Sequence, residues 1–275
     1  MNEQQLFEKI REWYNGYRFS PSRNVKIYNP TSLMYLLSKG EFRNYWFETG
    51  TPTFFVKLIK ERNYYIPELE HTEMVIYDIQ TTFELENLDI VSLLYQTGYL
   101  TIEDVGGEDW VILNYPNREV RVSFSNVLMR GVFEVKGSTP VLARKLGKAL
   151  YELDKERFDN LFNGIIKSIP NTLLINADEP KIHTIGYLSL VLAGYNARSE
   201  VLTCDGRIDI VIEFKDKIFV IEFKVNQAPQ KGIERIKGRK YYQKYIGLCK
   251  EIYLVGINYD SERKIIRSLI EKFFR

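Results

Sequence analysis

The segment GRIDIVIEFKDKIFVIEFKV, residues 206–225, gives the clearest structural signal in the sequence. It predicts two β-strands rich in Ile, Val and Phe, joined by a short charged turn at 215–217. Strands that are mainly apolar on both faces are typical of the centre of a sheet that is covered on both sides. Charged side chains nevertheless interrupt these apolar runs: Asp209 in the first strand, and Glu222 and Lys224 in the second.

The three charged residues favour a metal site with a neighbouring lysine. Side chains alternate between the faces of a strand, so Glu222 and Lys224 share one face. Burying a charge is costly unless a partner or a metal compensates it. Asp209 and Glu222 could offer the hard oxygen ligands that Mg²⁺ and Mn²⁺ prefer, and Lys224 could orient a water or stabilise a charged transition state. An ordinary ion pair near a strand end is the simpler alternative.

Composition limits the class of protein. The chain has 275 residues, of which 45% are hydrophobic, enough for one large domain or two modest ones. Its 38 Lys and Arg nearly balance 36 Asp and Glu, but residues 201–275 carry 16 basic against 10 acidic side chains, which permits an anionic partner. Cys204 and Cys249 form no disulfide or CxxC pattern. With no signal-like or membrane-spanning apolar run, we expect a soluble cytoplasmic protein without a membrane partner.

Periodicity predicts two regions along the chain. In the first, helices are expected over 4–14, 31–40, 52–61 and 88–97, followed by strands at 99–104 and 109–115, a winged-helix-like ending. A break is expected near 131–140. Beyond it we expect helices over 141–166, then a helix, a strand and the opening hairpin, a basic helix over 229–246, a strand over 251–258 and a final amphipathic helix over 261–274.

Asp209, followed across a hairpin by Glu222-Phe223-Lys224, resembles the PD-(D/E)XK nuclease superfamily. The resemblance is closer to the bacterial branch in which a nuclease-like domain follows an AAA-ATPase-like domain. It rests on SEVLTCDGRIDIVIE (199–213), FVIEFKV (219–225), RIKGRKYYQKY (235–245) and IYLVGIN (252–258). Near the N-terminus, REWYNGYRF (11–19), IYNPTSLMYLL (27–37) and NYWFETGTP (44–52) resemble the C-terminal part of the ATPase-like domain.

This resemblance implies an α/β (α+β) fold in two parts. Residues 131–275 would form a restriction-endonuclease-like mixed sheet flanked by helices. Residues 1–130 would form the C-terminal part of the ATPase-like domain, mainly helical with the winged-helix-like end. The sequence has no GxxxxGK[ST] loop, so we expect no productive ATP binding, and the chain is expected to start after the ATP-binding core of a longer parent.

The resemblance also implies roles for individual residues. Asp209, Glu222 and Lys224 would be catalytic, and the metal ligands would be Asp209, Glu222, the Phe223 backbone carbonyl and Glu179. His183, one helical turn after Glu179, and Glu200 are possible accessory residues. Two positions depart from the family pattern: Ile208 replaces the proline of the motif, and Arg235 stands where the branch often has glutamine.

The implied activity is an endo- or exodeoxyribonuclease that uses Mg²⁺ or Mn²⁺ to hydrolyse phosphodiester bonds in DNA. The basic helix would hold the phosphate backbone through Lys231, Arg235, Lys237, Lys240 and Lys244. A solvated lysine-rich helix face is the alternative for these side chains. A second function remains open: a catalytically silent module that binds nucleic acid or a partner. A third is that the N-terminal half serves mainly for oligomerisation.

Overall fold

The structure, a computed structural model, describes residues 2–46, 53–80, 89–107, 109–137 and 139–273. Its contacts divide the chain into two units. The N-terminal unit comprises Met1–Tyr64 and Glu68–Val127, and the C-terminal unit comprises Tyr65–Pro67 and Leu128–Arg275. The division lies within helix α6 (Arg118–Gly131), slightly before the break expected near 131–140.

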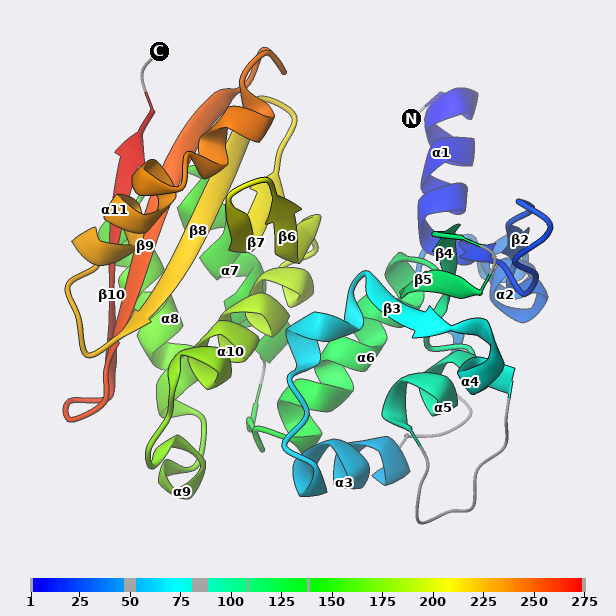
Figure 1. Cartoon of the computed structure of the whole chain (residues 1–275), viewed down its shortest axis with the longest axis horizontal. Helices are drawn as coiled ribbons and strands as arrows, with labels where there is room; N and C mark the ends of the chain where they lie inside the picture. The colour runs from blue at the N-terminus through cyan, green and yellow to red at the C-terminus, as the bar shows by residue number, and fades with distance from the viewer. Residues whose placement is uncertain (1, 47–52, 81–88, 108, 138, 274–275) are drawn as a thin grey trace. The chain divides into compact units, whose positions relative to one another are not determined.

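The N-terminal unit is mainly helical (Figure 1). Its elements are α1 (Glu3–Tyr14), β1 (Asn15–Tyr17), β2 (Ile27–Tyr28), α2 (Pro30–Lys39), α3 (Thr53–Glu61), β3 (Thr72–Val75), α4 (Ile76–Gln80), α5 (Ile90–Gln96), β4 (Thr101–Val105), β5 (Trp110–Asn114) and most of α6; the short 3₁₀ turn η2 (Ile66–Leu69) crosses from the C-terminal unit into it. The predicted helices and the hairpin after α5 are confirmed within the described residues. Strand β3 was not predicted; it pairs with β5 to complete a three-stranded antiparallel sheet in the order β3-β5-β4.

Local sequence explains where these helices start and stop. At the start of α1, the Asn2 side chain accepts a hydrogen bond from the Gln5 backbone N–H, and the Gln5 side chain accepts one from the Asn2 N–H, which forms a capping box. Helix α2 ends at Gly40, whose φ of 69° is the left-handed conformation that glycine adopts without strain.

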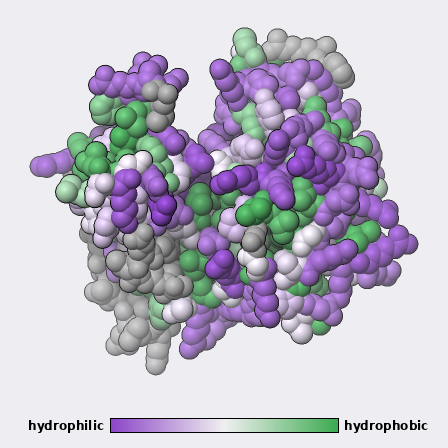
Figure 2. Space-filling model, turned by 180° about the vertical axis from the view of Figure 1, so that it is seen from behind, coloured by the Kyte–Doolittle hydropathy of each residue, from purple (hydrophilic) through white to green (hydrophobic). Residues whose placement is uncertain are grey.

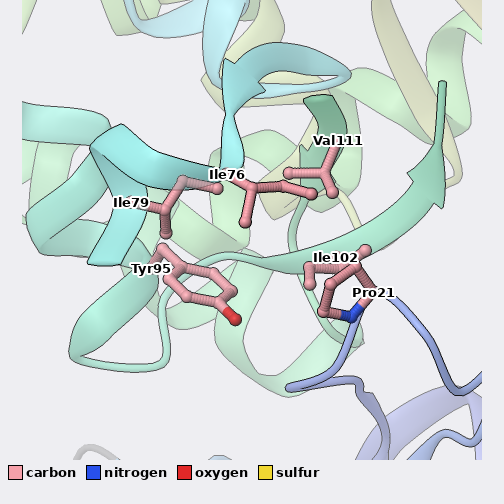
Figure 3. Close-up of a pocket in the computed structure, with 6 residues that line it drawn as sticks. All are labelled: Pro21, Ile76, Ile79, Tyr95, Ile102 and Val111. Atoms are coloured by element: carbon pink, nitrogen blue, oxygen red, sulfur yellow. The ribbon is translucent and has the colours of Figure 1, made fainter. Parts of the chain in front are cut away.

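A small cavity lies inside the N-terminal unit (Figure 3). Its volume is about 10 Å³, and it is lined by Pro21, Ile76, Ile79, Tyr95, Ile102 and Val111. That volume is about the space that one water molecule needs, and the lining is largely apolar. The cavity therefore has room for about one water molecule and for no larger ligand.

The C-terminal unit is built around a mixed five-stranded sheet. Its elements are α7 (Thr139–Tyr151), α8 (Lys155–Lys167), α9 (Asn171–Leu174), α10 (Glu179–Leu192), β6 (Ala197–Thr203), β7 (Gly206–Glu213), β8 (Lys217–Val225), α11 (Gln230–Gly238), the 3₁₀ turn η4 (Tyr241–Tyr245), β9 (Glu251–Asp260) and β10 (Ile265–Lys272). The strand order is β10-β9-β8-β7-β6; β8 and β9 pair in parallel, and the other neighbouring pairs are antiparallel.

Helices cover both faces of this sheet. Figure 1 shows α7, α8 and α10 on one face and α11 on the other. Strand β8 is central, and its side chains divide between the two layers: Ile218 and Val220 pack with Ile233 of α11, while Phe223 packs against Gly186 of α10. This architecture is the restriction-endonuclease-like arrangement that the sequence predicts. The charged residues of β8 therefore lie on the central strand of a sheet that helices cover on both faces.

The final helix predicted over 261–274 is wrong, because residues 265–272 form the edge strand β10. Their apolar residues fit a helical spacing as well as an alternating one, so periodicity alone does not decide between them. Strand β9 offers a free edge for pairing, and the chain turns back at Lys264, whose φ is 54°. Buried Ile266 and Ser268 then alternate with exposed Arg267.

The basic helix predicted over 229–246 is shorter than expected. Helix α11 ends at Gly238, and Lys240 has a left-handed φ of 52° that an α-helix cannot contain. The 3₁₀ turn η4 follows and buries Tyr241 and Tyr245 in the core with Ile233. These two tyrosines therefore pack in the core and do not offer rings for base stacking.

The surface is polar on the face shown in Figure 2, where hydrophilic side chains predominate and hydrophobic ones form small separate groups. Among the residues that the structure describes, no helix is both long enough and apolar enough to cross a membrane.

Candidate functional site

Asp209 lies where the ladder between β7 and β8 opens. The two strands pair from Glu213–Ile218 to Ile210–Ile221, and their ladder ends there. At the next position the Asp209 carboxylate accepts a hydrogen bond from the Phe223 backbone N–H, with a distance of 2.7 Å between Oδ2 and N. The side chain of Asp209 thus replaces a ladder bond and is fixed beside Glu222 and Lys224.

Glu222 is fully buried on the side of β8 that α11 covers. Among the described residues, neither of its carboxylate oxygens has a hydrogen-bond partner. Two cations are within ion-pair distance of Oε2: the Arg235 Nε at 3.2 Å and the Lys224 Nζ at 3.8 Å. These contacts offset part of its charge but leave its lone pairs without a donor of good geometry, which is costly for a buried carboxylate.

Lys224 bridges several oxygens of the site. Its Nζ lies 2.7 Å from Glu179 Oε1 and 2.5 Å from the Phe223 carbonyl oxygen, in addition to the contact with Glu222. The ammonium therefore contacts three of the groups that the sequence predicts as metal ligands. A bound divalent cation and Lys224 would share these oxygens.

Burial raises the pKa values of the Glu222 and Asp209 carboxyls. For Glu222 desolvation is the main cause and the neighbouring Asp209 charge adds to it, while Arg235 and Lys224 oppose both. For Asp209 desolvation again dominates, and the hydrogen bond from Phe223 N–H opposes it most. A cation near these two carboxyls would stabilise their ionised forms and lower their pKa values.

The donor set fits a hard divalent cation. Two adjacent carboxylates and a backbone carbonyl are oxygen donors of the kind that Mg²⁺ and Mn²⁺ prefer, and Glu222 has both oxygens free of hydrogen bonds within the described residues. However, Glu179 Oε1 is engaged by Lys224. Within the same residues, no three His, Cys, Asp or Glu side chains are arranged to hold a metal ion.

Local structure explains the position of Glu179. The Asp178 side chain caps α10 by accepting a hydrogen bond from the Lys181 N–H, and Pro180 follows in the first turn, so Glu179 lies at the start of the helix. From there its carboxylate reaches Lys224 and lies 3.9 Å from an Arg235 nitrogen.

His183 and Glu200 gather in a second polar group next to Phe223. The His183 ring stacks on the Phe223 ring, with centroids 5.5 Å apart and planes 23° apart. His183 Nδ1 lies 3.5 Å from Glu200 Oε1, and Tyr65 hydrogen-bonds to both residues. Sequence reasoning missed Tyr65, because it lies 118 positions before His183 and no local pattern marks it.

Most of the basic side chains predicted to bind nucleic acid have local partners. Lys231 pairs with Glu234 at 2.8 Å, and Lys237 pairs with Glu271 at 2.5 Å. Lys244 donates to the Leu202 carbonyl at 3.0 Å. Arg235 belongs to the site, since its Nε lies 3.2 Å from Glu222. Gly232 lets α11 pack closely on the sheet, because a Cβ there would lie 2.9 Å from the Gly256 Cα and 3.1 Å from the Glu222 carbonyl oxygen.

Comparison with known proteins gives two findings. Residues 177–268 match a family model described as PD-(D/E)XK nuclease superfamily. The matched range contains Glu179, the β7–β8 hairpin and α11. Over 274 residues the chain is 32% identical to "Uncharacterized protein in vnfD 5'region" of Azotobacter chroococcum mcd 1, a match that covers 96% of this chain and 52% of that protein. The chain therefore spans about half the length of this relative.

Proposed function

We propose that the C-terminal unit is a metal-dependent nuclease that hydrolyses phosphodiester bonds in DNA. The observation that carries the proposal is the fully buried Glu222, with neither oxygen hydrogen-bonded within the described residues, beside Asp209 and Lys224. The match of residues 177–268 to the PD-(D/E)XK nuclease superfamily supports the same reading. A pair of carboxylates beside a lysine has a clear use in phosphodiester hydrolysis, where negative charge develops on phosphate oxygens.

The proposed ligands for Mg²⁺ or Mn²⁺ are Asp209, Glu222 and the Phe223 carbonyl, with Glu179 as a further carboxylate. When bound, the ion would supply Lewis-acid polarisation of the phosphate and a more acidic water. The hydrogen bond from Phe223 N–H keeps Asp209 turned toward β8, which pre-organises the carboxylates before the ion arrives.

Lys224 acts in this proposal as a positioned cation. Its Nζ donates to Glu179 and to the Phe223 carbonyl, so its direction is fixed by two oxygens of the site. A fixed ammonium can stabilise the charge that grows on the phosphate oxygens as the water oxygen attacks phosphorus and the bond to the leaving oxygen breaks. Arg235 contacts Glu222 and is half-exposed. Its guanidinium can therefore bind a DNA phosphate at the edge of the site.

Cleavage of labelled DNA and RNA of the same sequence tests the substrate. The proposal expects hydrolysis of DNA in Mg²⁺ or Mn²⁺, and loss of that hydrolysis in Asp209→Ala and Lys224→Ala. Cleavage of RNA alone would contradict the choice of DNA. Equal hydrolysis by all three proteins would contradict the assigned residues.

A catalytically silent binding module is the second candidate. It is favoured by the engagement of Glu179 with Lys224, and by the lack of a three-residue metal group among the described side chains. Salt-dependent DNA binding without cleavage in Mg²⁺, Mn²⁺, Ca²⁺ or Co²⁺ would support this candidate and exclude the first.

We further propose that the N-terminal unit corresponds to the C-terminal part of an AAA-ATPase-like domain. Its mainly helical structure, with the hairpin β4-β5 directly after α5, supports this. The proposal expects no tight ATP binding by this chain; tight Mg²⁺-dependent binding of ATP in calorimetry would contradict it.

A further inference from the structure

Three polar side chains from distant parts of the chain meet within the C-terminal unit; we refer to Tyr65, His183 and Glu200 as the Tyr65 cluster. The Tyr65 hydroxyl donates to Glu200 Oε1 at 2.7 Å and is also hydrogen-bonded to His183 Nδ1. Since the hydroxyl proton is given to Glu200, His183 Nδ1 is the donor to the Tyr65 oxygen. Arg207 lies 3.6 Å from the other oxygen of Glu200 and balances its charge.

The backbone around the cluster is held in place on both sides. Ser199, which is fully buried, donates a hydrogen bond to the Pro67 carbonyl at 2.9 Å and so fixes the Tyr65–Pro67 segment against β6. Glu200 lies within β6 with a φ of 49°, between the ladder pairs Ser199–Ile210 and Val201–Ile208. A left-handed residue other than glycine inside a strand is strained, and such strain persists where the surroundings impose it, often at functional sites.

The cluster lies against the ring of Phe223. His183, which is 2% exposed, stacks on that ring, and Gly186 on the same helix makes room for it, because a Cβ there would lie 2.4 Å from the ring. The backbone of Phe223 in turn holds Asp209 through its N–H and contacts Lys224 through its carbonyl. A chain of direct contacts therefore runs from Tyr65 through His183 and Phe223 to Asp209.

We propose that Tyr65 is a positioning residue of the active site. Its hydroxyl fixes the His183 ring, which sets the place of Phe223 and hence of the backbone groups that hold Asp209 and Lys224. The proposal rests on the proposed function, since it concerns the same site. The segment Tyr65–Pro67 is far from the hairpin in sequence but belongs to the C-terminal unit, and the proposal gives it a role in holding the active site in place.

The test compares the 275-residue chain carrying Tyr65→Phe with the same chain carrying Tyr64→Phe, a matched control whose residue belongs to the N-terminal unit. The chain has 16 Phe residues, so ¹⁵N-Phe labelling gives a countable NMR spectrum in which Phe223→Leu identifies the Phe223 signal. We expect the Phe223 amide to exchange with solvent about tenfold faster in Tyr65→Phe and at the wild-type rate in Tyr64→Phe. Unchanged Phe223 exchange in Tyr65→Phe would overturn the proposal.

A second readout uses Mn²⁺ affinity and cleavage kinetics. Loss of a residue that orients metal ligands through others costs about 10-fold or more in metal affinity or activity. We expect Tyr65→Phe to weaken Mn²⁺ binding and lower kcat by about tenfold, with KM for DNA close to wild type. If the wild type neither binds Mn²⁺ nor cleaves DNA, the proposed function fails, while Phe223 exchange still decides whether Tyr65 positions Phe223.

Glu200→Gln keeps the proposal testable if Tyr65→Phe does not fold. The amide oxygen of glutamine still accepts from the Tyr65 hydroxyl, while the charge facing Arg207 is removed. We expect Phe223 exchange within about twofold of wild type in Glu200→Gln and faster exchange in Glu200→Ala. Equal exchange in these two variants would contradict a role for the Tyr65 contact.

Discussion

The Lys224 ammonium lies 2.7 Å from the carboxylate of Glu179, a residue 45 positions earlier in the chain. The same ammonium contacts the Phe223 carbonyl and lies 3.8 Å from Glu222. One lysine thus connects the first turn of α10 with the central strand β8 at the oxygens proposed to bind a metal.

Lys224→Met separates metal binding from catalysis. We expect Mn²⁺ to bind about tenfold tighter in calorimetry at pH 8, because the variant removes a positive charge that shares oxygens with the ion. DNA cleavage should fall by about 100-fold or more, since the transition state loses a fixed cation. Lys215→Met, in the exposed turn between β7 and β8, is the control and should match the wild type in both. Weaker Mn²⁺ binding by Lys224→Met would contradict the shared-oxygen arrangement.

Stability should fall with rising pH when EDTA removes divalent ions. Burial raises the pKa of Glu222 above its unfolded value, so the folded protein binds more protons than the unfolded chain between these two values. That contribution to stability is complete below the unfolded pKa and is lost as pH rises toward the folded pKa. We expect urea denaturation to show a loss on the order of 1–3 kcal/mol between pH 5 and pH 8.

Glu222→Gln provides the comparison, because glutamine resembles the protonated carboxyl and does not titrate. Its stability should be nearly flat over the same pH range, and Mn²⁺ should no longer stabilise it. Glu262→Gln, in the exposed turn before β10, should show the same fall in the free energy of unfolding with rising pH as the wild type. An identical slope in wild type and Glu222→Gln would show that Glu222 is not the titrating group.

Arg235→Gln should weaken DNA binding without a large change in fold. Arg235 is half-exposed and is positioned by Glu222, so it can place a guanidinium at a phosphate. Fluorescence anisotropy in Ca²⁺ should show weaker DNA binding. The slope of log K for DNA binding against log salt concentration should fall by about 1, as expected when one phosphate contact is lost. Arg263→Gln, in the exposed turn after β9, serves as the control. An unchanged salt dependence in Arg235→Gln would exclude this contact.

Gly186→Ala tests the packing beneath the site. A Cβ at this position would lie 2.4 Å from the Phe223 ring, so we expect a loss of about 1–3 kcal/mol in the free energy of unfolding. Gly164→Ala is a matched control in helix α8, where a Cβ meets nothing within 4 Å, and it should gain up to about 1 kcal/mol from helix propensity. Equal stability of the two variants would mean that Phe223 is not confined by α10.

Sequence patterns predict the parts of this fold that depend on neighbouring residues. The apolar runs of β7 and β8 are local signals, and the structure confirms these two strands. The hairpin also brings Asp209, Glu222 and Lys224 to one place, as expected from the two adjacent strands. Whether these residues bind a metal remains a prediction.

Features that depend on tertiary contacts were not predictable from the sequence. The segment 265–272 has apolar residues that suit a helix, but the free edge of β9 makes it a strand. Tyr65 reaches His183 and Glu200 across more than 100 positions, so no spacing marks it. The left-handed backbone of Glu200 likewise has no signal, because glutamate does not favour that conformation.

The most direct test of the central claim is the rate at which the full chain cleaves supercoiled and linear DNA in Mg²⁺, in Mn²⁺ and in EDTA. The account predicts cleavage with either ion, none in EDTA, and a rate at least about 100-fold lower in Asp209→Ala, while Lys215→Met cleaves like the wild type. Cleavage that persists in EDTA, an equal rate in Asp209→Ala, or no cleavage by the wild type with either ion would contradict it.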